Sequence, residues 1–259
     1  MRMMKKVLGT VTVLALSVSL LAGCGSTAAS PVSSAASTAA ESTTSSVVSE
    51  TTSAAADENV AAAAQLLNDL TGSYQELWPV ILADEYQQTW LDDCTALVGE
   101  ENAEAAFEKL SSMVTGDVYG ENAVKAYANG GGAYFCGFTN GLVTLTFDGE
   151  TSTISGTDKD GNVLFSHTYH YIGMEPVRGL YEFESDDADS GEFTYFFLAP
   201  DTSAETYHIE FRYGSDAEAL SQYDAGEYAY WLASGISTDC DQTMIDKCIE
   251  LFCTENLAG

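Results

Sequence analysis

The chain has 259 residues, in which 39 Asp and Glu side chains outnumber nine Lys and Arg side chains, for a formal net charge of −30. A surface this negative repels the phosphates of nucleic acids and anionic lipid headgroups, so the charge excludes nucleic acid as an expected partner. The length leaves room for an export signal, a linker and one domain with its own hydrophobic core.

Residues 1–23 have the pattern of a secretion signal. Three basic residues precede an uncharged apolar run at residues 7–21, which is shorter than the roughly 20 residues of a membrane-spanning helix. The run ends in the sequence LAGC, residues 21–24, which resembles the bacterial lipobox. We therefore expect residues 1–23 to be removed and Cys24 to carry a lipid. That lipid would anchor the mature protein to the extracytoplasmic face of the cell membrane.

Residues 24–56 contain almost only Ser, Thr, Ala, Val and Glu. Such a segment cannot bury enough apolar surface to offset the entropy of ordering it, so it is predicted to be a disordered linker. The remaining residues, 57–259, contain all of the Trp, Tyr and Phe side chains. We expect them to form a single folded domain.

The first part of this domain is predicted to be helical. Residues 57–70 have apolar side chains at helical spacing, and the same spacing recurs at residues 84–94 and more clearly at 101–114. A further short helix is expected at 122–128, before the glycine-rich residues 129–132.

From residue 141 the pattern changes to alternation of apolar and polar side chains, which indicates half-buried strands. The expected strands cover residues 142–147, 151–155, 163–171, 179–184, 193–198 and 207–213, and two helices are expected at 217–223 and 242–254. A meander of six or more antiparallel strands usually closes into a barrel, because closure removes the unpaired edges. We therefore predict a mainly β fold, an antiparallel barrel with flanking α-helices.

Five cysteines follow the lipidated one, and they are Cys94, Cys136, Cys240, Cys248 and Cys253. The expected compartment permits disulfides, but the odd number leaves at least one thiol unpaired within a single chain. The pairing cannot be read from the spacing. A thiolate zinc site near the C-terminus is disfavoured, since the last three cysteines match no close C-x-x-C pair.

Three segments resemble the ZinT (YodA) family, lipocalin-like barrels of exported bacterial proteins that bind zinc or cadmium. The segments are LTGSYQELWP at residues 70–79, VRGLYEF at 177–183 and YHIEFRYGSDAEAL at 207–220. Their order and spacing agree with the family over most of residues 70–255. The resemblance implies a lipocalin-like (calycin) barrel, a zinc cofactor, and a role in supplying a metal ABC importer.

The resemblance also implies a metal site, but the sequence departs from it. Family members hold the metal at the barrel mouth with three His, two of them as His-x-His on one strand. Here Thr206 replaces the first of these and His208 keeps the second, while Phe196 or Phe197 stands near the position of the third. Because zinc in proteins takes about four ligands, His208 alone cannot hold it tightly.

Other residues could rebuild the site around His208. In a straight strand His208 and Glu210 share one face, whereas His167 and His170 point to opposite faces, so only one of those two can join. A His–His–carboxylate set suits zinc. We therefore name His208, His170, Glu210 and Glu205 as candidate ligands. The alternative is that His208 is a hydrogen-bonded residue inside the barrel or at its rim.

A competing hypothesis is a barrel that has lost its metal site. Such a barrel would keep a cavity for a small apolar ligand, with Phe196 and Tyr207 as candidate lining residues, or would bind a protein partner. An enzyme is not expected, because the sequence has no nucleophile elbow and no phosphate-binding glycine loop. The acidic residues 186–192 are expected to form a solvated hairpin loop rather than a calcium site.

Overall fold

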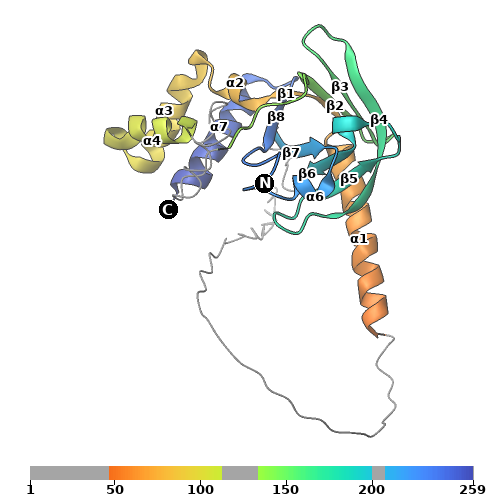
Figure 1. Cartoon of the computed structure of the whole chain (residues 1–259). Helices are drawn as coiled ribbons and strands as arrows, with labels where there is room; N and C mark the ends of the chain where they lie inside the picture. The colour runs from red at the N-terminus through yellow and green to blue at the C-terminus, as the bar shows by residue number, and fades with distance from the viewer. Residues whose placement is uncertain (1–46, 113–133, 200–207, 259) are drawn as a thin grey trace, which may run out of the picture. The chain divides into compact units, whose positions relative to one another are not determined.

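Eight antiparallel strands form a closed barrel in the order β1 to β8, and β8 returns to pair with β1 (Figure 1). The computed structural model describes residues 47–112, 134–199 and 208–258. The strands are β1 Gly72–Glu76, β2 Thr144–Asp148, β3 Thr153–Thr157, β4 Val163–Met174, β5 Tyr181–Ser185, β6 Tyr195–Leu198, β7 His208–Gly214 and β8 Ala233–Ser237. The predicted fold class, an antiparallel barrel with flanking helices, is confirmed.

The six predicted strands correspond to β2 through β7. The remaining two, β1 and β8, close the barrel through the pairs Tyr74 with Ser237 and Glu76 with Gly235. Neither strand has a clear alternation of apolar and polar side chains. In β8, four of the five residues are buried, and two of these four are Ser234 and Gly235.

Helix α1, Val47–Asp69, leads into the barrel. It begins ten residues before the predicted start at residue 57, so that residues 47–56 belong to the helix. Alanine has the highest helix propensity, and the alanines at 54–56 extend the helix toward the N-terminus. Its C-terminal half supplies the buried side chains of Ala63, Leu66 and Leu67 to the core of the barrel, and Leu70, directly after the helix, joins them.

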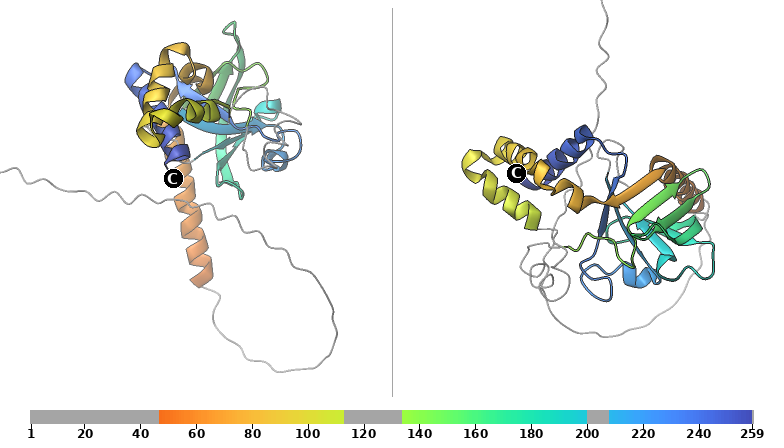
Figure 2. Two further views of the ribbon diagram at one scale, coloured as in Figure 1. Left: turned by 90° about the vertical axis from the view of Figure 1, so that its left-hand side faces the viewer. Right: turned by 90° about the horizontal axis from the view of Figure 1, so that it is seen from above.

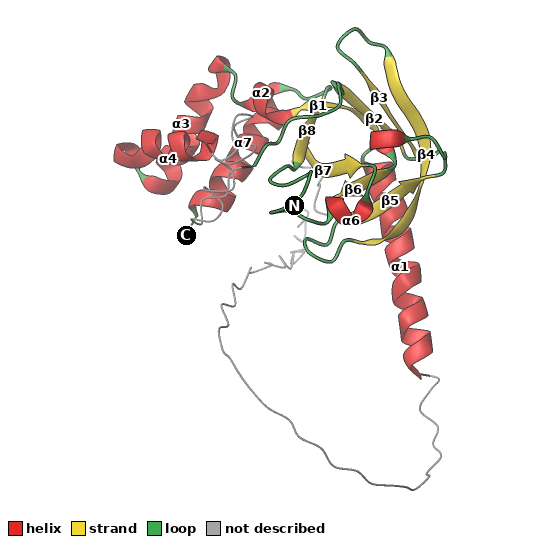
Figure 3. Cartoon of the chain, in the orientation of Figure 1, coloured by secondary structure: helices red, strands yellow, loops and turns green. Residues whose placement is uncertain are grey.

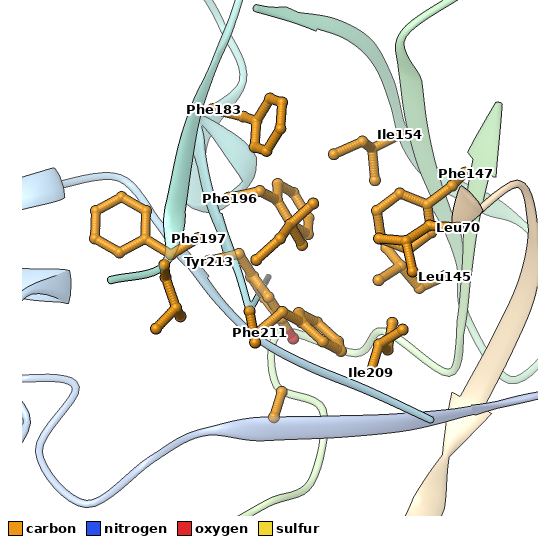
Figure 4. Packing of buried hydrophobic residues seen from close by; sticks show 14 of the residues in the cluster. Leu70, Leu145, Phe147, Ile154, Phe183, Phe196, Phe197, Ile209, Phe211 and Tyr213 are labelled. Carbon is orange, nitrogen blue, oxygen red and sulfur yellow. The ribbon is translucent and has the colours of Figure 1, made fainter. Parts of the chain in front are cut away.

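Aromatic side chains fill the interior of the barrel (Figure 4). Phe183 on β5 lies opposite Phe196 on β6, which in turn lies opposite Tyr213 on β7. Phe147 on β2 and Phe211 on β7 complete this cluster, and each is at most 1% exposed. Because close-packed interiors leave few voids larger than a water molecule, this part of the barrel is a core.

A second core lies in a layer of helices beside the barrel (Figures 2 and 3). The layer consists of α2 Leu77–Ile81, the 3-10 turn η1 Asp84–Tyr86, α3 Gln87–Val98, α4 Glu100–Ser112 and α7 Gln242–Leu257. Its buried side chains include Trp90, Leu110 and Ile249, and Ile236 of β8 joins them from the barrel wall. The wall at β8 is therefore covered on both faces, and α7 is one of the helices that flank the barrel.

Two short helical turns complete the described structure. They are η3 Gly191–Phe193 and α6 Ala217–Leu220, and the carboxylate of Asp216 caps α6 by accepting a hydrogen bond from the backbone N of Ala219 at 3.1 Å. The helix predicted at 122–128 lies outside the described residues. Among the helices that the structure describes, none combines the length and apolarity needed to cross a bilayer.

Candidate functional site

Strand β7 presents different chemistry on its two faces. Ile209, Phe211 and Tyr213 point into the barrel core. His208 and Glu210 alternate with them and therefore point outward, toward the helix layer. The ring of His208 lies 5.6 Å from the ring of Phe252 on α7. His208 is thus placed on the outer wall, at the first residue of β7 and against a helix.

The structure does not bring His170 to His208. His170 pairs in register with Glu184 of β5, then with Tyr195 of β6 and Gly214 of β7. Gly214 and His208 are the two ends of β7, so roughly 20 Å of strand separates His208 from the row of His170. His170 instead faces Asp186, with Nδ1 to Oδ1 2.7 Å.

The other candidate ligands divide in the same way. Glu210 shares the outer face of β7 with His208, whereas Glu205 lies outside the described residues, as do Cys24 and Tyr207. Within the three described ranges, no group of three or more His, Cys, Asp or Glu side chains is placed to hold a metal ion. Since a protein zinc site takes about four ligands, the described residues do not fit a zinc ion at His208.

Phe196 is a core residue and does not line a ligand cavity. It is 0% exposed, and its ring lies 5.3 Å from Tyr213, 5.4 Å from Tyr169 and 5.8 Å from Phe165. Phe196 is therefore placed in the packed core of the barrel. The alternating pattern correctly placed Phe196 inside the barrel but could not show that neighbouring rings fill the interior.

A pocket of about 320 Å³ lies between the outer wall of the barrel and the helix layer. The wall contributes Glu210 and Ser234, which face each other across β7 and β8. The helix layer contributes a mainly apolar side, formed by Trp78, Trp90, Leu110, Phe252, Glu255 and Asn256. The remaining lining residues, Tyr134, Cys136, Arg178 and Leu232, come from connecting segments.

Arg178 is held in place at this pocket by its surroundings. Its guanidinium donates a hydrogen bond to the hydroxyl of Tyr134 at 2.9 Å and lies over the rings of Tyr134 and Tyr223, at 5.1 and 4.6 Å from their centroids. The backbone N of Arg178 donates to the carboxylate of Glu175 at 2.6 Å, and Glu175 is only 1% exposed. These contacts hold both the backbone and the side chain of Arg178 in place, and its guanidinium supplies a positive charge to the pocket.

The thiol of Cys136 is a weak nucleophile in this pocket. Burial, with a smaller contribution from the charge of Glu210, raises the pKa of its thiol to about 12. The thiol is therefore mainly protonated at neutral pH, which disfavours nucleophilic attack by Cys136. The chemistry of the pocket therefore rests on its aromatic side chains, the carboxylate of Glu210 and the guanidinium of Arg178.

The alternating patterns in the sequence did not indicate this pocket, but the scarcity of arginine could have done so. Only six Lys and Arg side chains follow residue 23, and just two of them are arginines, Arg178 and Arg212. Arg212 lies on the outer face of β7 and stacks under Tyr223, at 4.4 Å from Cζ to the ring centroid. Both arginines thus contact the same tyrosine beside the pocket.

Comparison with known proteins gives structural similarity only. No sequence profile of a known family matches the chain, and no curated protein matches it. The chain is similar to the Zn(II)-bound ZinT-like domain of AdcA from Streptococcus pneumoniae, at 16% identity over 71% of this chain and 89% of that domain, with a TM-score of 0.45. It is also similar to Zn(II)-bound AdcA itself, at 14% identity over 74% of this chain and 35% of AdcA, with a TM-score of 0.40. The first of these is described as ZinT-like, which is the family that the three sequence segments resemble, and at these identities the similarity concerns the fold alone.

Proposed function

We propose that this chain is a binding protein that holds a small amphipathic organic molecule between the barrel wall and the helix layer. The observation that carries the proposal is the pocket of about 320 Å³ with aromatic, anionic and cationic side chains on its lining. Small-molecule sites are typically apolar concavities with a few fixed polar groups. The packed barrel core at Phe196 supports the outer pocket as the site, in place of the interior.

The lining suggests what such a ligand contains. Trp78 and Phe252, whose ring centroids are 5.0 Å apart, offer flat apolar surface to an aromatic or aliphatic body. Arg178 offers a guanidinium to an acidic group of the ligand, and the carboxylate of Glu210 can accept hydrogen bonds from hydroxyl or amine groups.

The N-terminal pattern supports the cellular setting of this function. The secretion signal at residues 1–23 and the lipobox-like LAGC motif support export and lipid anchoring at Cys24, on the extracytoplasmic side of the membrane. The sequence of residues 24–46 supports a linker between the anchor and the described domain.

Zinc binding, with delivery to a metal ABC importer, is the second candidate function. It is favoured by the placement of His208 and Glu210 on one face of β7 and by the resemblance of residues 207–220 to the metal-binding strand of the ZinT family. Two side chains are fewer than the roughly four ligands that zinc takes in proteins. This function therefore requires further donors beyond those that the described residues bring to His208.

The first experiment tests the pocket with the fluorescent anion 8-anilinonaphthalene-1-sulfonate, which combines an aromatic body with an acidic group. Saturable one-site binding to the full chain should weaken at least about tenfold in Arg178→Met, because the guanidinium pairs with the sulfonate. Lys159→Met is the matched control, since it removes the same charge from a side chain that is 78% exposed. Equal affinities for wild type, R178M and K159M would argue against the pocket.

The second experiment separates zinc from the organic ligand. Zinc is titrated into the full chain by calorimetry, beside His208→Ala, after the free thiols have been blocked. Stoichiometric binding that is tight in the wild type and lost in H208A would favour the metal function. Weak binding that is unchanged in H208A would leave the pocket as the functional site.

A further inference from the structure

The helix layer contains two facing cysteines that the pocket does not use. Cys94 lies on α3 and Cys253 on α7, and their Sγ atoms are 3.9 Å apart. Both side chains are 0% exposed. They lie 159 residues apart in the sequence, so only the packing of the two helices brings them together.

We propose that Cys94 and Cys253 form a disulfide in the mature protein, which joins α3 to α7 covalently. An S–S bond is about 2.05 Å long, so the two sulfur atoms would have to approach by about 1.9 Å from their present separation. Side-chain rotation and small shifts of the helices can supply this movement. The proposal rests on the proposed export, because disulfides persist in oxidising compartments outside the cytoplasm.

The chemistry is thiol–disulfide exchange with an external disulfide, such as the active-site disulfide of an oxidoreductase. The thiolate of one cysteine attacks a sulfur of that disulfide and forms a mixed disulfide, and the first leaving thiolate takes up a proton. The second cysteine then loses its proton and displaces the remaining sulfur of the oxidant. Two protein thiols are thereby oxidised to one disulfide, and the oxidant is reduced to two thiols.

The surroundings of the pair determine when this exchange can occur. Burial raises the pKa of both thiols above the ordinary value, so little thiolate is present in the folded protein. An external disulfide also cannot reach side chains that are fully buried. The bond therefore forms before α7 has docked on α3, and once formed it resists reducing agents unless the helix layer opens.

The bond would act on the proposed ligand site. Phe252, which precedes Cys253 on α7, lines the pocket, and so does Trp90, one helical turn before Cys94 on α3. A covalent link between the two helices fixes the apolar side of the pocket against separation. Reduction of the bond would let that side open.

The test is a thiol map of the exported full chain, extracted from membranes. Free thiols are blocked with N-ethylmaleimide in guanidinium, and the protein is digested and analysed by mass spectrometry without reduction. We expect one cross-linked peptide pair joining Cys94 to Cys253, with the label on Cys136, Cys240 and Cys248. Label on both Cys94 and Cys253, or a cross-link of either one to a different cysteine, would overturn the proposal.

A second arm separates the pairing from export. Chain 24–259 made in a reducing cytoplasm is unfolded, then refolded in the presence of glutathione disulfide. Formation of the same cross-link supports the pairing even if the protein proves not to be exported. Refolding to the native state without this cross-link would overturn it.

Reduction should also be visible as a loss of thermal stability. A reductant that reaches the bond should lower the melting temperature of the oxidised wild type by roughly 5–15 °C. The double variant Cys94→Ala/Cys253→Ala should show no such shift. Cys248→Ala, which removes another buried thiol from α7, should keep it. A shift of equal size in the double variant would contradict the proposal.

Discussion

Replacement of Arg212 by methionine should destabilise the domain by about 2–4 kcal/mol. Arg212 is 0% exposed, and its guanidinium donates hydrogen bonds to the backbone carbonyls of Leu220 and Tyr228 and, at 3.5 Å, to that of Gln222. These hydrogen bonds attach the segment that follows β7 to the outer wall of the barrel. Methionine keeps most of the apolar stem but makes none of these bonds.

The magnitude follows from counting those bonds. A hydrogen bond from a charged group contributes about 1.5–3 kcal/mol, so the two close bonds together contribute about 3–6 kcal/mol, and the bond to Gln222 adds little at its length. Removing the guanidinium also removes the cost of burying it, which is the same cost that lowers the pKa of Arg212. This offset brings the expected loss down to about 2–4 kcal/mol.

The assay is urea unfolding at pH 7, followed by tryptophan fluorescence, with the free energy taken from midpoint and slope. Lys159→Met removes the same charge from an exposed position and should stay within about 0.5 kcal/mol of wild type. Arg212→Lys keeps the charge but cannot reach the same carbonyls with a planar fork, so it should fall between wild type and R212M. A loss below about 1 kcal/mol in R212M, at unchanged slope, would refute the idea that Arg212 fastens this segment.

Three further predictions concern the barrel and the helix layer. Phe196→Ala should cost about 3–5 kcal/mol in urea unfolding, because it opens a cavity at a 0% exposed site, and a loss below about 1 kcal/mol would contradict a packed interior. Gly214→Ala should lower stability by about 1–3 kcal/mol, because its Cβ would lie 2.5 Å from the hydroxyl oxygen of Tyr228, whereas Gly173→Ala meets only an ordinary contact and is its control. Burial, together with neighbouring carboxylates, raises the pKa of Asp93 above its unfolded value of 3.8, so the folded state binds more protons and loses stability as pH rises from the unfolded to the folded pKa. Asp93→Asn should therefore raise the urea midpoint at pH 7, with a gap that narrows as pH falls from the folded pKa toward 3.8 and is closed below it; a constant gap would show that charge is not the cause.

The sequence by itself predicted the strands whose two faces differ. Strands β2 to β5 were recognised because the residues on one face of each are more buried than those on the other, which leaves an alternating pattern in the sequence. Strands β6 and β7 were recognised from their apolar and aromatic residues, although β6 and the second half of β7 are buried on both faces. Helices α3, α4 and α7 were recognised for the corresponding reason at helical spacing. These signals are local, so they locate elements along the chain and indicate a closed barrel.

The sequence did not reveal the two strands that close the barrel. The outer face of β8 is covered by the helix layer, so both of its faces are buried and no alternation remains to be read. Strand β1 is defined by its pairing with β8, which follows it by more than 150 residues. Such pairing depends on the assembled fold and leaves little trace in the residues of either strand.

Only the tertiary structure decided which chemical groups meet. The spacing of His208 and Glu210 correctly placed them on one face of β7, but only the packing of α7 showed that this face is the outer wall. His170 was grouped with His208 because both are imidazoles on strands, whereas strand register places them in rows separated by the length of β7. The pocket beside Arg178 is likewise assembled from segments far apart in the sequence. Periodicity reports the environment of one element at a time, while a binding site requires the relative placement of several.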